Sequence, residues 1–546
     1  MVPASQWVPA RSSFGRGRER GRYGGPSGRS VTGASLAGDR KPSERQDSSR
    51  LARGAGITIF GRLGGRGSQL IGQIVLARVL GPEAFGLYAI GFTLLRVFGF
   101  LSVLGLDTGV IFFASRYWKK DLSALKAALQ EGVGAAGAFG ALVGLGLFLL
   151  ASWLAERVFH QPALAPVIRW FVPAFLFAAA LRVAAAATRT VQRMQYSVWT
   201  QDICQPVASL VLILLSAWMG WGLLGAVGAT VASFAVALVL GWSFVRRLFP
   251  EAFQRGVQSR SVFREMIVYS IPASLAGMAA LYLVWIDRLM VGMFRPAADV
   301  GVYQAVTQLA IAFPTILTAF GSVITPMIAQ LYHQGEIPRL EALFRTSTRW
   351  GLYLCLPAAL VVCFAPGEVL TVLFGSAYAG GAVPLVILTV GQLINVTTGS
   401  THAVLLMTGQ QRVWFIVSAS MLAAGIALNW LLIPRLGLVG AAVAMSVTLS
   451  IQVILGLLLI RGRLRIWPYD HHFLKGAVVT AAAAATLALL DIVLKTAPPL
   501  FVLGAMVTAV VVVFGGGLLA LGLDEADRDL LQAVRARLGG WGWRVQ

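Results

Sequence analysis

Fourteen long apolar stretches recur along this chain, and this recurrence constrains its fold more than any other feature. A helix needs roughly 20 apolar residues to cross the hydrocarbon core of a bilayer. Hydrophobic residues make up 57% of the 546 and charged residues only 12%, against about 25% charged in soluble domains. The predicted fold class is therefore an all-α integral membrane protein with about 14 transmembrane helices.

The predicted spans are residues 55–80, 85–115, 127–154, 164–188, 202–220, 222–245, 265–294, 300–331, 350–374, 381–408, 413–433, 437–460, 473–494 and 499–523. Several of them are long enough to require tilting or protrusion from the bilayer. The three cysteines, Cys204, Cys355 and Cys363, all fall within apolar stretches. The sequence therefore predicts neither a disulfide framework nor a metal site.

Lysine and arginine residues indicate the orientation, because cytoplasmic loops carry an excess of them. With the N-terminus in the cytoplasm, the cytoplasmic loops and C-terminal tail carry 23 of these residues, counting Lys475. The outer loops carry only four: Arg157, Arg295, Arg435 and Lys495. Both termini are therefore predicted to be cytoplasmic.

The net charge of +22 suggests a nucleic-acid partner at first sight, but its location argues otherwise. Residues 1–53 form a Gly/Ser/Arg-rich tail with 11 Lys/Arg and 4 Asp/Glu, a composition that predicts disorder. The tail also lacks the apolar core of a secretory signal peptide. It is attracted to anionic membrane lipids, or it is a dispensable tail, or it results from an over-extended translation start. No nucleic-acid partner is predicted.

Short outer loops weigh against a membrane glycosyltransferase, polymerase or ligase. Such enzymes usually need a sizeable loop with acidic or histidine residues for acid–base chemistry. The loops here show no paired carboxylates, Ser/His/Asp set or metal-ligand spacing, and we interpret His471 and His472 as part of a solvated loop. The sequence predicts no catalytic residue and no enzyme.

An internal repeat divides the chain into two halves. Gly86-Leu87-Tyr88 corresponds to Gly301-Val302-Tyr303, and Gly222 corresponds to Gly437 at the same separation along the chain. We call this shared separation the repeat offset. Each half holds six spans, so the two face the same way and predict two lobes around a central cavity. The predicted domains are a disordered basic cytoplasmic tail (1–53), an N-lobe (54–248), a C-lobe (262–461), two further helices (472–523) and a cytoplasmic tail (524–546).

Four stretches carry a family resemblance: "LARVLGPEAFGLYA", "SIPASLAGMAALYLVWIDRLMVGMF", "FGSAYAGGAVPLVIL" and "LLIPRLGLVGAAVA". In this order and spacing, residues 51–520 resemble the polysaccharide transporters, or O-antigen flippases, of the multidrug/oligosaccharidyl-lipid/polysaccharide flippase superfamily. The resemblance implies alternating access in the inner membrane and transfer of an undecaprenyl-diphosphate-linked oligosaccharide. It also suggests a polysaccharide polymerase as a partner. It implies nothing about the basic tail.

Polar residues inside predicted spans identify candidate binding sites, because they are costly in a bilayer and usually face a cavity or a partner. In the first span Arg62, Arg66, Gln69 and Gln73 follow one helical face. We predict that this face lines the substrate cavity. The alternative is that the two arginines extend toward the cytoplasmic interface.

The other candidates lie on the second, fourth, seventh and tenth spans. Arg96 and Arg182 are predicted substrate contacts, with structural charge pairing as the alternative for Arg96. Gln392 and Asn395 belong, with Gly399 and His402, to an uncharged stripe suited to sugar hydroxyls, although interhelical hydrogen bonding explains it almost as well. Asp107 and Asp287 are candidates for coupling to a proton or sodium gradient, and no other cofactor is predicted.

The excess of arginine over acidic residues inside the spans favours an anionic substrate such as a diphosphate. The leading prediction is therefore a lipid-linked oligosaccharide flippase. A lipid II flippase or a multidrug/toxin antiporter of the same superfamily stays open, and a membrane glycosyltransferase or polymerase is the alternative from another class. A cationic-drug exporter would favour acidic and aromatic residues instead.

Overall fold

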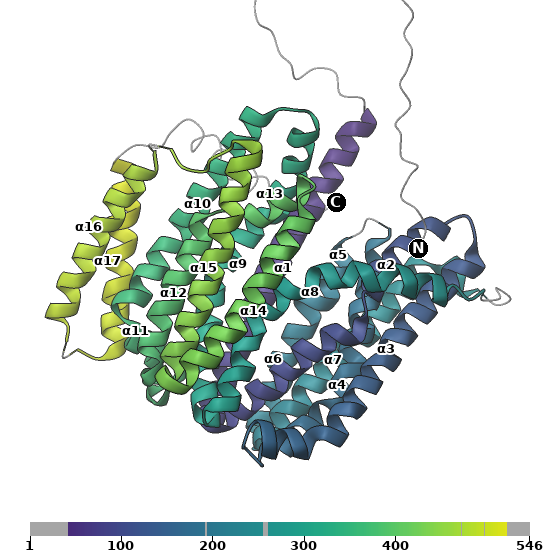
Figure 1. Cartoon of the computed structure of the whole chain (residues 1–546), viewed down its shortest axis with the longest axis horizontal. Coiled ribbons are helices and arrows are strands. Elements are labelled where there is room, and N and C mark those ends of the chain that lie inside the picture. Colours follow the sequence, from purple (N-terminus) through teal and green to yellow (C-terminus); the bar gives the residue numbers. More distant parts are fainter. Residues whose placement is uncertain (1–41, 192–193, 255–259, 471, 496, 521–546) are drawn as a thin grey trace, which may run out of the picture. The chain divides into compact units, whose positions relative to one another are not determined.

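The computed structural model describes residues 42–191, 194–254, 260–470, 472–495 and 497–520 (Figure 1). The chain divides into a short N-terminal unit, Met1–Leu51, and a compact unit, Ala52–Gln546. The basic tail was predicted to be disordered over residues 1–53, but residues 42–53 are helical as the start of α1, and residues 1–41 lie outside the described residues. The described residues form helices and connecting turns, without a strand.

The N-terminal half contains α1 (Pro42–Val103), α2 (Leu106–Tyr117), α3 (Leu122–Trp153), the π-helix η1 (Leu154–Val158), α4 (Leu164–Arg189), α5 (Met194–Ser197), the π-helix η2 (Val198–Cys204), α6 (Gln205–Trp218), α7 (Gly222–Leu248) and the 3-10 helix η3 (Pro250–Phe253). We call α1–α7 the N-lobe.

The C-terminal half contains α8 (Phe263–Phe294), α9 (Ala297–His333), α10 (Ile337–Phe364), α11 (Pro366–Phe374), the 3-10 helix η4 (Ser376–Gly381), α12 (Ala382–Thr397), α13 (Thr401–Met407), α14 (Gln411–Leu436) and α15 (Leu438–Leu464). We call α8–α15 the C-lobe. The last two helices, α16 (His472–Val493) and α17 (Pro499–Ala520), lie side by side (Figure 1) and pack against α10.

The prediction of an all-α, multi-pass membrane protein is confirmed. Within the described residues, 11 segments are long and apolar enough to cross a membrane. The first of them, Gly64–Tyr117, covers two predicted spans. The seventh and eighth predicted spans lie on α8 and α9, helices that also contain residues outside the described set. Together these account for the fourteen predicted spans.

The first hairpin turns at Gly81. This residue has φ 74° and ψ 173°, so α1 consists of two helices joined there. Glycine adopts a positive φ without the steric cost that a Cβ atom would bring. Pro82 follows directly, and proline suits the first turn of a helix because its missing N–H has no intrahelical partner there. The predicted Gly-Pro turn is therefore present.

The repeat predicted from the sequence is visible in the helix packing. In the N-lobe α3 packs on α4, α4 on α7, and α6 on α7. In the C-lobe the equivalent pairs are α10 with α12, α12 with α15, and α14 with α15, and all three are in contact. The two lobes therefore share one helix arrangement, as a parallel repeat requires.

The two copies of the repeated glycine meet each other at the contact between the lobes. A Cβ atom on Gly86 would lie 1.8 Å from the carbonyl oxygen of Ala297, and one on Gly301 would lie 2.0 Å from that of Pro82. Pro82 and Ala297 are themselves separated by the repeat offset. Each lobe thus presents the same surface to the other, which is the signature of a twofold axis.

The repeated tyrosines are anchored at equivalent places in the two lobes. Tyr88 and Tyr303 are both buried. The Tyr88 hydroxyl shares a hydrogen bond of 2.9 Å with Thr230, and the Tyr303 hydroxyl lies 4.0 Å from the sulfur of Met445. Thr230 and Met445 are again separated by the repeat offset. The predicted two-lobe architecture therefore extends to individual side chains.

We expect Gly86→Ala to destabilise the protein, because a methyl group has no space beside the Ala297 carbonyl oxygen. Overpacking of this kind costs about 1–3 kcal/mol. Gly134→Ala on α3 is the matched control, since a Cβ atom there meets nothing within 4 Å. Thermal unfolding in detergent should show a lower midpoint for Gly86→Ala only. Equal midpoints for both variants would contradict the close contact between the lobes.

Candidate functional site

A polar cavity of about 470 Å³ lies on the N-lobe, with walls from α1, α2, α4, η2, α6 and α7 and from Trp285 of α8. Its charged lining residues are Arg66, Arg96, Arg182, Arg189, Asp107 and Asp202. Four arginines against two aspartates give the cavity a formal excess of positive charge. Water-excluding surroundings strengthen the attraction of such a site for anions.

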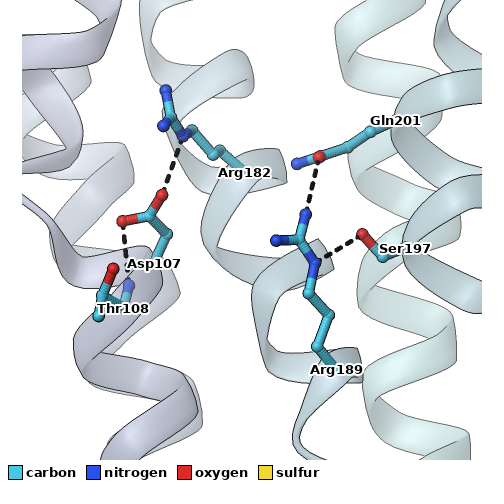
Figure 2. Close-up of polar contacts among 6 residues, drawn as sticks. All are labelled: Asp107, Thr108, Arg182, Arg189, Ser197 and Gln201. Carbon is cyan, nitrogen blue, oxygen red and sulfur yellow. Dashed lines mark hydrogen bonds and ion pairs between the residues drawn. The ribbon is translucent and has the colours of Figure 1, made fainter. Parts of the chain in front are cut away.

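Arg182 and Asp107 form an ion pair in the cavity wall (Figure 2). The Arg182 Nε donates to Asp107 Oδ2 over 3.1 Å, and the Thr108 backbone N–H donates to Asp107 Oδ1 over 3.0 Å. The Arg182 guanidinium also lies 4.3 Å from the centre of the Phe100 ring. The Arg182 side chain is 38% exposed, so the pair leaves part of the guanidinium facing the cavity.

Arg96 sits among aromatic rings. Its guanidinium carbon lies 4.9 Å from the centre of the Phe92 ring and 5.8 Å from that of Trp285. Cation–π contacts hold the plane of a guanidinium without occupying its N–H donors. The orientation of the Arg96 guanidinium is therefore set by these two rings and not by a carboxylate.

Arg66 and Arg189 are held by neutral partners. Arg66 Nη1 donates to the hydroxyl of Thr315 on α9 over 3.2 Å. Arg189 Nε donates to the Ser197 hydroxyl over 3.0 Å, and its Nη2 donates to Gln201 Oε1 over 3.4 Å (Figure 2). Because Arg189 follows Arg182 by two helical turns on α4, the two cations lie on one face of that helix.

A π-helix forms one wall of the cavity. Gln201 and Asp202 lie on η2, and π-helical turns occur frequently at functional sites. The glycine-rich face of α1 packs against this wall, since a Cβ atom on Gly65 would lie only 1.4 Å from the Asp202 carbonyl oxygen. Glycine at position 65 therefore allows α1 to reach η2 and bring Arg66 beside it.

Five of the predicted site residues come together on this cavity: Arg66, Gln69, Arg96, Asp107 and Arg182. The side chain of Arg62 lies outside the described residues. Gln73 is buried and accepts a 3.3 Å hydrogen bond from the Gln304 side chain. It lines an adjoining space of about 20 Å³ rather than the main cavity, and Gln69 and Arg96 line both. A volume of that size holds roughly one water molecule.

The structure does not place Gln392 and Asn395 on the cavity. Their side chains bond each other, with Asn395 Nδ2 donating to Gln392 Oε1 over 3.4 Å. The predicted polar stripe ran on to Gly399 and His402, but α12 ends at Thr397 and Gly399 has φ 67°. The stripe therefore has no continuous helical face, and a sugar-binding role for these residues stays a prediction.

Asp287 lies in a buried cluster of the C-lobe and lines neither cavity. Its Oδ2 accepts a 2.8 Å bond from the Tyr303 hydroxyl, and its Oδ1 accepts one of 2.8 Å from the Arg288 backbone N–H. Asp287 and Asp107 thus differ in setting, since Asp107 faces the cavity. Their coupling to an ion gradient stays a prediction.

Sequence reasoning missed Arg189, Gln201, Asp202, Gln205 and Trp285 as cavity residues. Arg189 was detectable, because its spacing of two helical turns from Arg182 places both on one face of α4. The residues around η2 carry no such signal, because a π-helical turn changes the helical periodicity, so that residues before and after it do not follow one predictable face. Trp285 comes from the C-lobe, so only the packing of the lobes brings it to the site.

The sequence matches two family models. The model described as polysaccharide biosynthesis protein matches residues 51–332, about half of the chain, and the model described as MatE matches residues 272–431. The succinoglycan biosynthesis transport protein of Rhizobium meliloti is 25% identical over 64% of this chain and 68% of its own length. The probable low-salt glycan biosynthesis flippase of Haloferax volcanii is 23% identical over 45% of this chain and 53% of its own.

A solved lipid II flippase in an inward closed conformation shares the fold. Its TM-score is 0.68 at 12% sequence identity, and the match covers 84% of this chain and 97% of that one. The chain spans only about half the length of the Haloferax relative that it matches. At these identities the structural likeness concerns the helix arrangement alone.

Proposed function

This chain belongs to the polysaccharide biosynthesis protein family, and we propose that it flips an undecaprenyl-diphosphate-linked oligosaccharide across the cytoplasmic membrane by alternating access between its two lobes. The observation that carries the proposal is the arginine-rich cavity. We further propose that both termini are cytoplasmic, that a proton or sodium gradient drives the cycle, and that a polysaccharide polymerase receives the product.

A diphosphate matches the charge of the cavity. Arg66, Arg96 and Arg182 line one space of about 470 Å³. Guanidinium groups bind phosphate oxygens through two parallel N–H donors, and the bond strengthens when both groups carry charge. The arginines are already oriented by Thr315, Phe92 and Asp107. Little side-chain entropy is therefore lost when a diphosphate binds.

Neutral polar groups beside the arginines suit sugar hydroxyls. Gln69, Gln201 and Gln205 line the same cavity, and their amides offer both donors and acceptors. Phe100 and Trp285 supply aromatic surface in the same wall. The combination of cations, amides and rings fits a headgroup that joins a diphosphate to a sugar.

A multidrug antiporter that exports cations is the weaker alternative, although the MatE model matches part of the C-lobe. A cationic drug would meet four arginines in this cavity, and like charges repel strongly where water is scarce. A lipid II flippase would use the same diphosphate chemistry and differs only in the attached glycan. Substrate competition separates these cases.

The test uses the purified full-length protein in lipid nanodiscs, with geranylgeranyl diphosphate as the probe and geranylgeraniol as its neutral counterpart. We expect saturable binding of the diphosphate alone, with affinity falling as salt rises. Proteoliposomes should then flip a fluorescent undecaprenyl-diphosphate oligosaccharide. Binding of an organic cation in preference to the diphosphate would overturn the proposal.

A further inference from the structure

The wall of the cavity contains a negative group where an anionic substrate would bind. Asp107 occupies one edge of the Arg182 guanidinium through a single 3.1 Å bond to Nε (Figure 2). The guanidinium also lies over the Phe100 ring, 4.3 Å from its centre. A phosphate with two oxygens aimed at the guanidinium therefore competes directly with the Asp107 carboxylate.

Asp107 belongs to a helix that begins directly after a sharp joint in the backbone. The preceding helix α1 ends at Val103, and Leu104 and Gly105 have φ 47° and 74°. A left-handed conformation is strained for leucine, so these two residues interrupt the helix rather than continue it. Asp107 lies in the first turn of α2, next to that joint.

The far side of α2 is packed tightly against the other lobe. A Cβ atom on Gly109 would lie 2.1 Å from the Ser270 hydroxyl oxygen and 3.0 Å from the Met266 side chain, both on α8. Phe112 of α2 also stacks on Tyr269 with ring centres 4.4 Å apart. The helix α2 is therefore in tight contact with α8 as well as with α4.

We infer that Asp107 is a positioning residue whose ion pair with Arg182 depends on whether the cavity is occupied. Without substrate, Asp107 binds Arg182, and a bound substrate phosphate takes its place on the guanidinium. The exchange removes the ion pair between α2 and α4 and leaves the apolar packing between them. The helix α2 then turns about Leu104 and Gly105 together with α8, so that anion binding in the N-lobe is transmitted to the C-lobe. This inference rests on the proposed binding of a diphosphate in the cavity.

The decisive variant is Asp107→Asn, which removes the charge and keeps the shape. The Asp299→Asn variant is the matched control, because Asp299 forms an ion pair with Arg295 outside the cavity. Spin labels at Ser115→Cys on α2 and Val239→Cys on α7 measure the distance between these two helices. Because α7 packs against α4, this distance reports the position of α2 relative to α4. Both sites are exposed, and the three native cysteines are replaced by alanine.

In the parent protein, geranylgeranyl diphosphate should shift the distance between the two labels. The ligand-free Asp107→Asn variant should already show the shifted distance, and Asp299→Asn should behave as the parent. Asp107→Asn should also bind the probe more tightly, up to about fivefold, since the anion no longer displaces a carboxylate. Transport should become slower, because occupancy no longer changes the position of α2.

Two outcomes separate the two proposals. If the parent binds the diphosphate and the ligand-free Asp107→Asn distance equals that of the ligand-free parent, the occupancy role of Asp107 is wrong and the binding function stands. If neither protein binds the diphosphate, the proposed function itself is wrong.

Discussion

Replacing Arg96 and Arg182 together by alanine is expected to abolish export of the lipid-linked oligosaccharide while the protein still accumulates in the membrane. Each charge-assisted hydrogen bond contributes about 1.5–3 kcal/mol. Losing one from each arginine lowers substrate affinity roughly a hundredfold to ten thousandfold, since about 1.4 kcal/mol corresponds to a factor of ten. Asp107→Asn is added to this variant, because an unpaired carboxylate would cost stability. The Asp107→Asn single variant is measured beside it, so that the further loss is assigned to the two arginines.

The measurement is binding of geranylgeranyl diphosphate by the purified variant, followed by oligosaccharide transport in proteoliposomes. Lysine at both positions should restore only part of the affinity, because an ammonium keeps the charge but loses the two-pronged geometry. The matched control is Arg169→Ala on the same helix α4. Arg169 bonds Ser152 over 2.9 Å and does not line the cavity. Transport at the parental rate from the double alanine variant would remove the cavity arginines from the mechanism.

The number and nature of the spans were predictable because the signals are local. A long apolar stretch is sufficient to specify a membrane helix, and Gly81 with Pro82 specifies the first turn. The repeat was predictable from Gly86 and Gly301, whose offset reflects a duplicated arrangement. Sequence spacing alone, however, did not show that these two glycines contact each other.

The parts of the site that escaped prediction depend on where helices break. Arg96 and Asp107 both lie in the predicted span 85–115, which was expected to be one helix, whereas Leu104 and Gly105 interrupt it. Arg96 reaches the cavity from α1, and Asp107 reaches it because α2 packs back against α4. The stripe of Gln392 was interrupted in the same way, at Gly399. Helical periodicity holds only inside an unbroken helix, and these breaks carry no strong local signal.

Sequence alone also could not show which arginines line the cavity. The chain offers many arginines within or near its spans, and charge alone does not distinguish cavity from lipid interface. Arg169 and Arg182 are on the same helix, yet only Arg182 reaches the cavity. Their separation is not a whole number of helical turns, so they lie on different faces. Which face is the cavity face depends on the packing of α4 between its neighbours, and this is a tertiary property.

Arg78 joins the two lobes at the end of the bundle that carries the Gly81 turn. Its Nε donates to the carbonyl oxygen of Leu373 over 2.8 Å, and its Nη2 donates to that of Val372. Both carbonyls belong to the last turn of α11, where a cation is favoured by the helix dipole. The Tyr378 hydroxyl adds a bond of 2.7 Å to the carbonyl oxygen of Ala77. With both termini cytoplasmic, as proposed, this is the outer end, and outward opening of the carrier has to break these contacts.

Arg78→Ala is therefore expected to raise the fraction of outward-open carrier about tenfold or more, since each lost bond from a charged group is worth about 1.5–3 kcal/mol. Labelling of Gln69→Cys by a membrane-impermeant maleimide from the outer face reports this fraction, in a background without the native cysteines. Gln69 lines the cavity, so it reacts only when the outer end is open.

Arg435→Ala, near another predicted outer turn, serves as the control for lost positive charge. Tyr378→Phe should have a smaller effect, because a neutral hydrogen bond contributes only about 0.5–1.5 kcal/mol. Unchanged labelling in Arg78→Ala would mean that the lobes are held at this end by the contact between Gly86 and Gly301 rather than by the arginine.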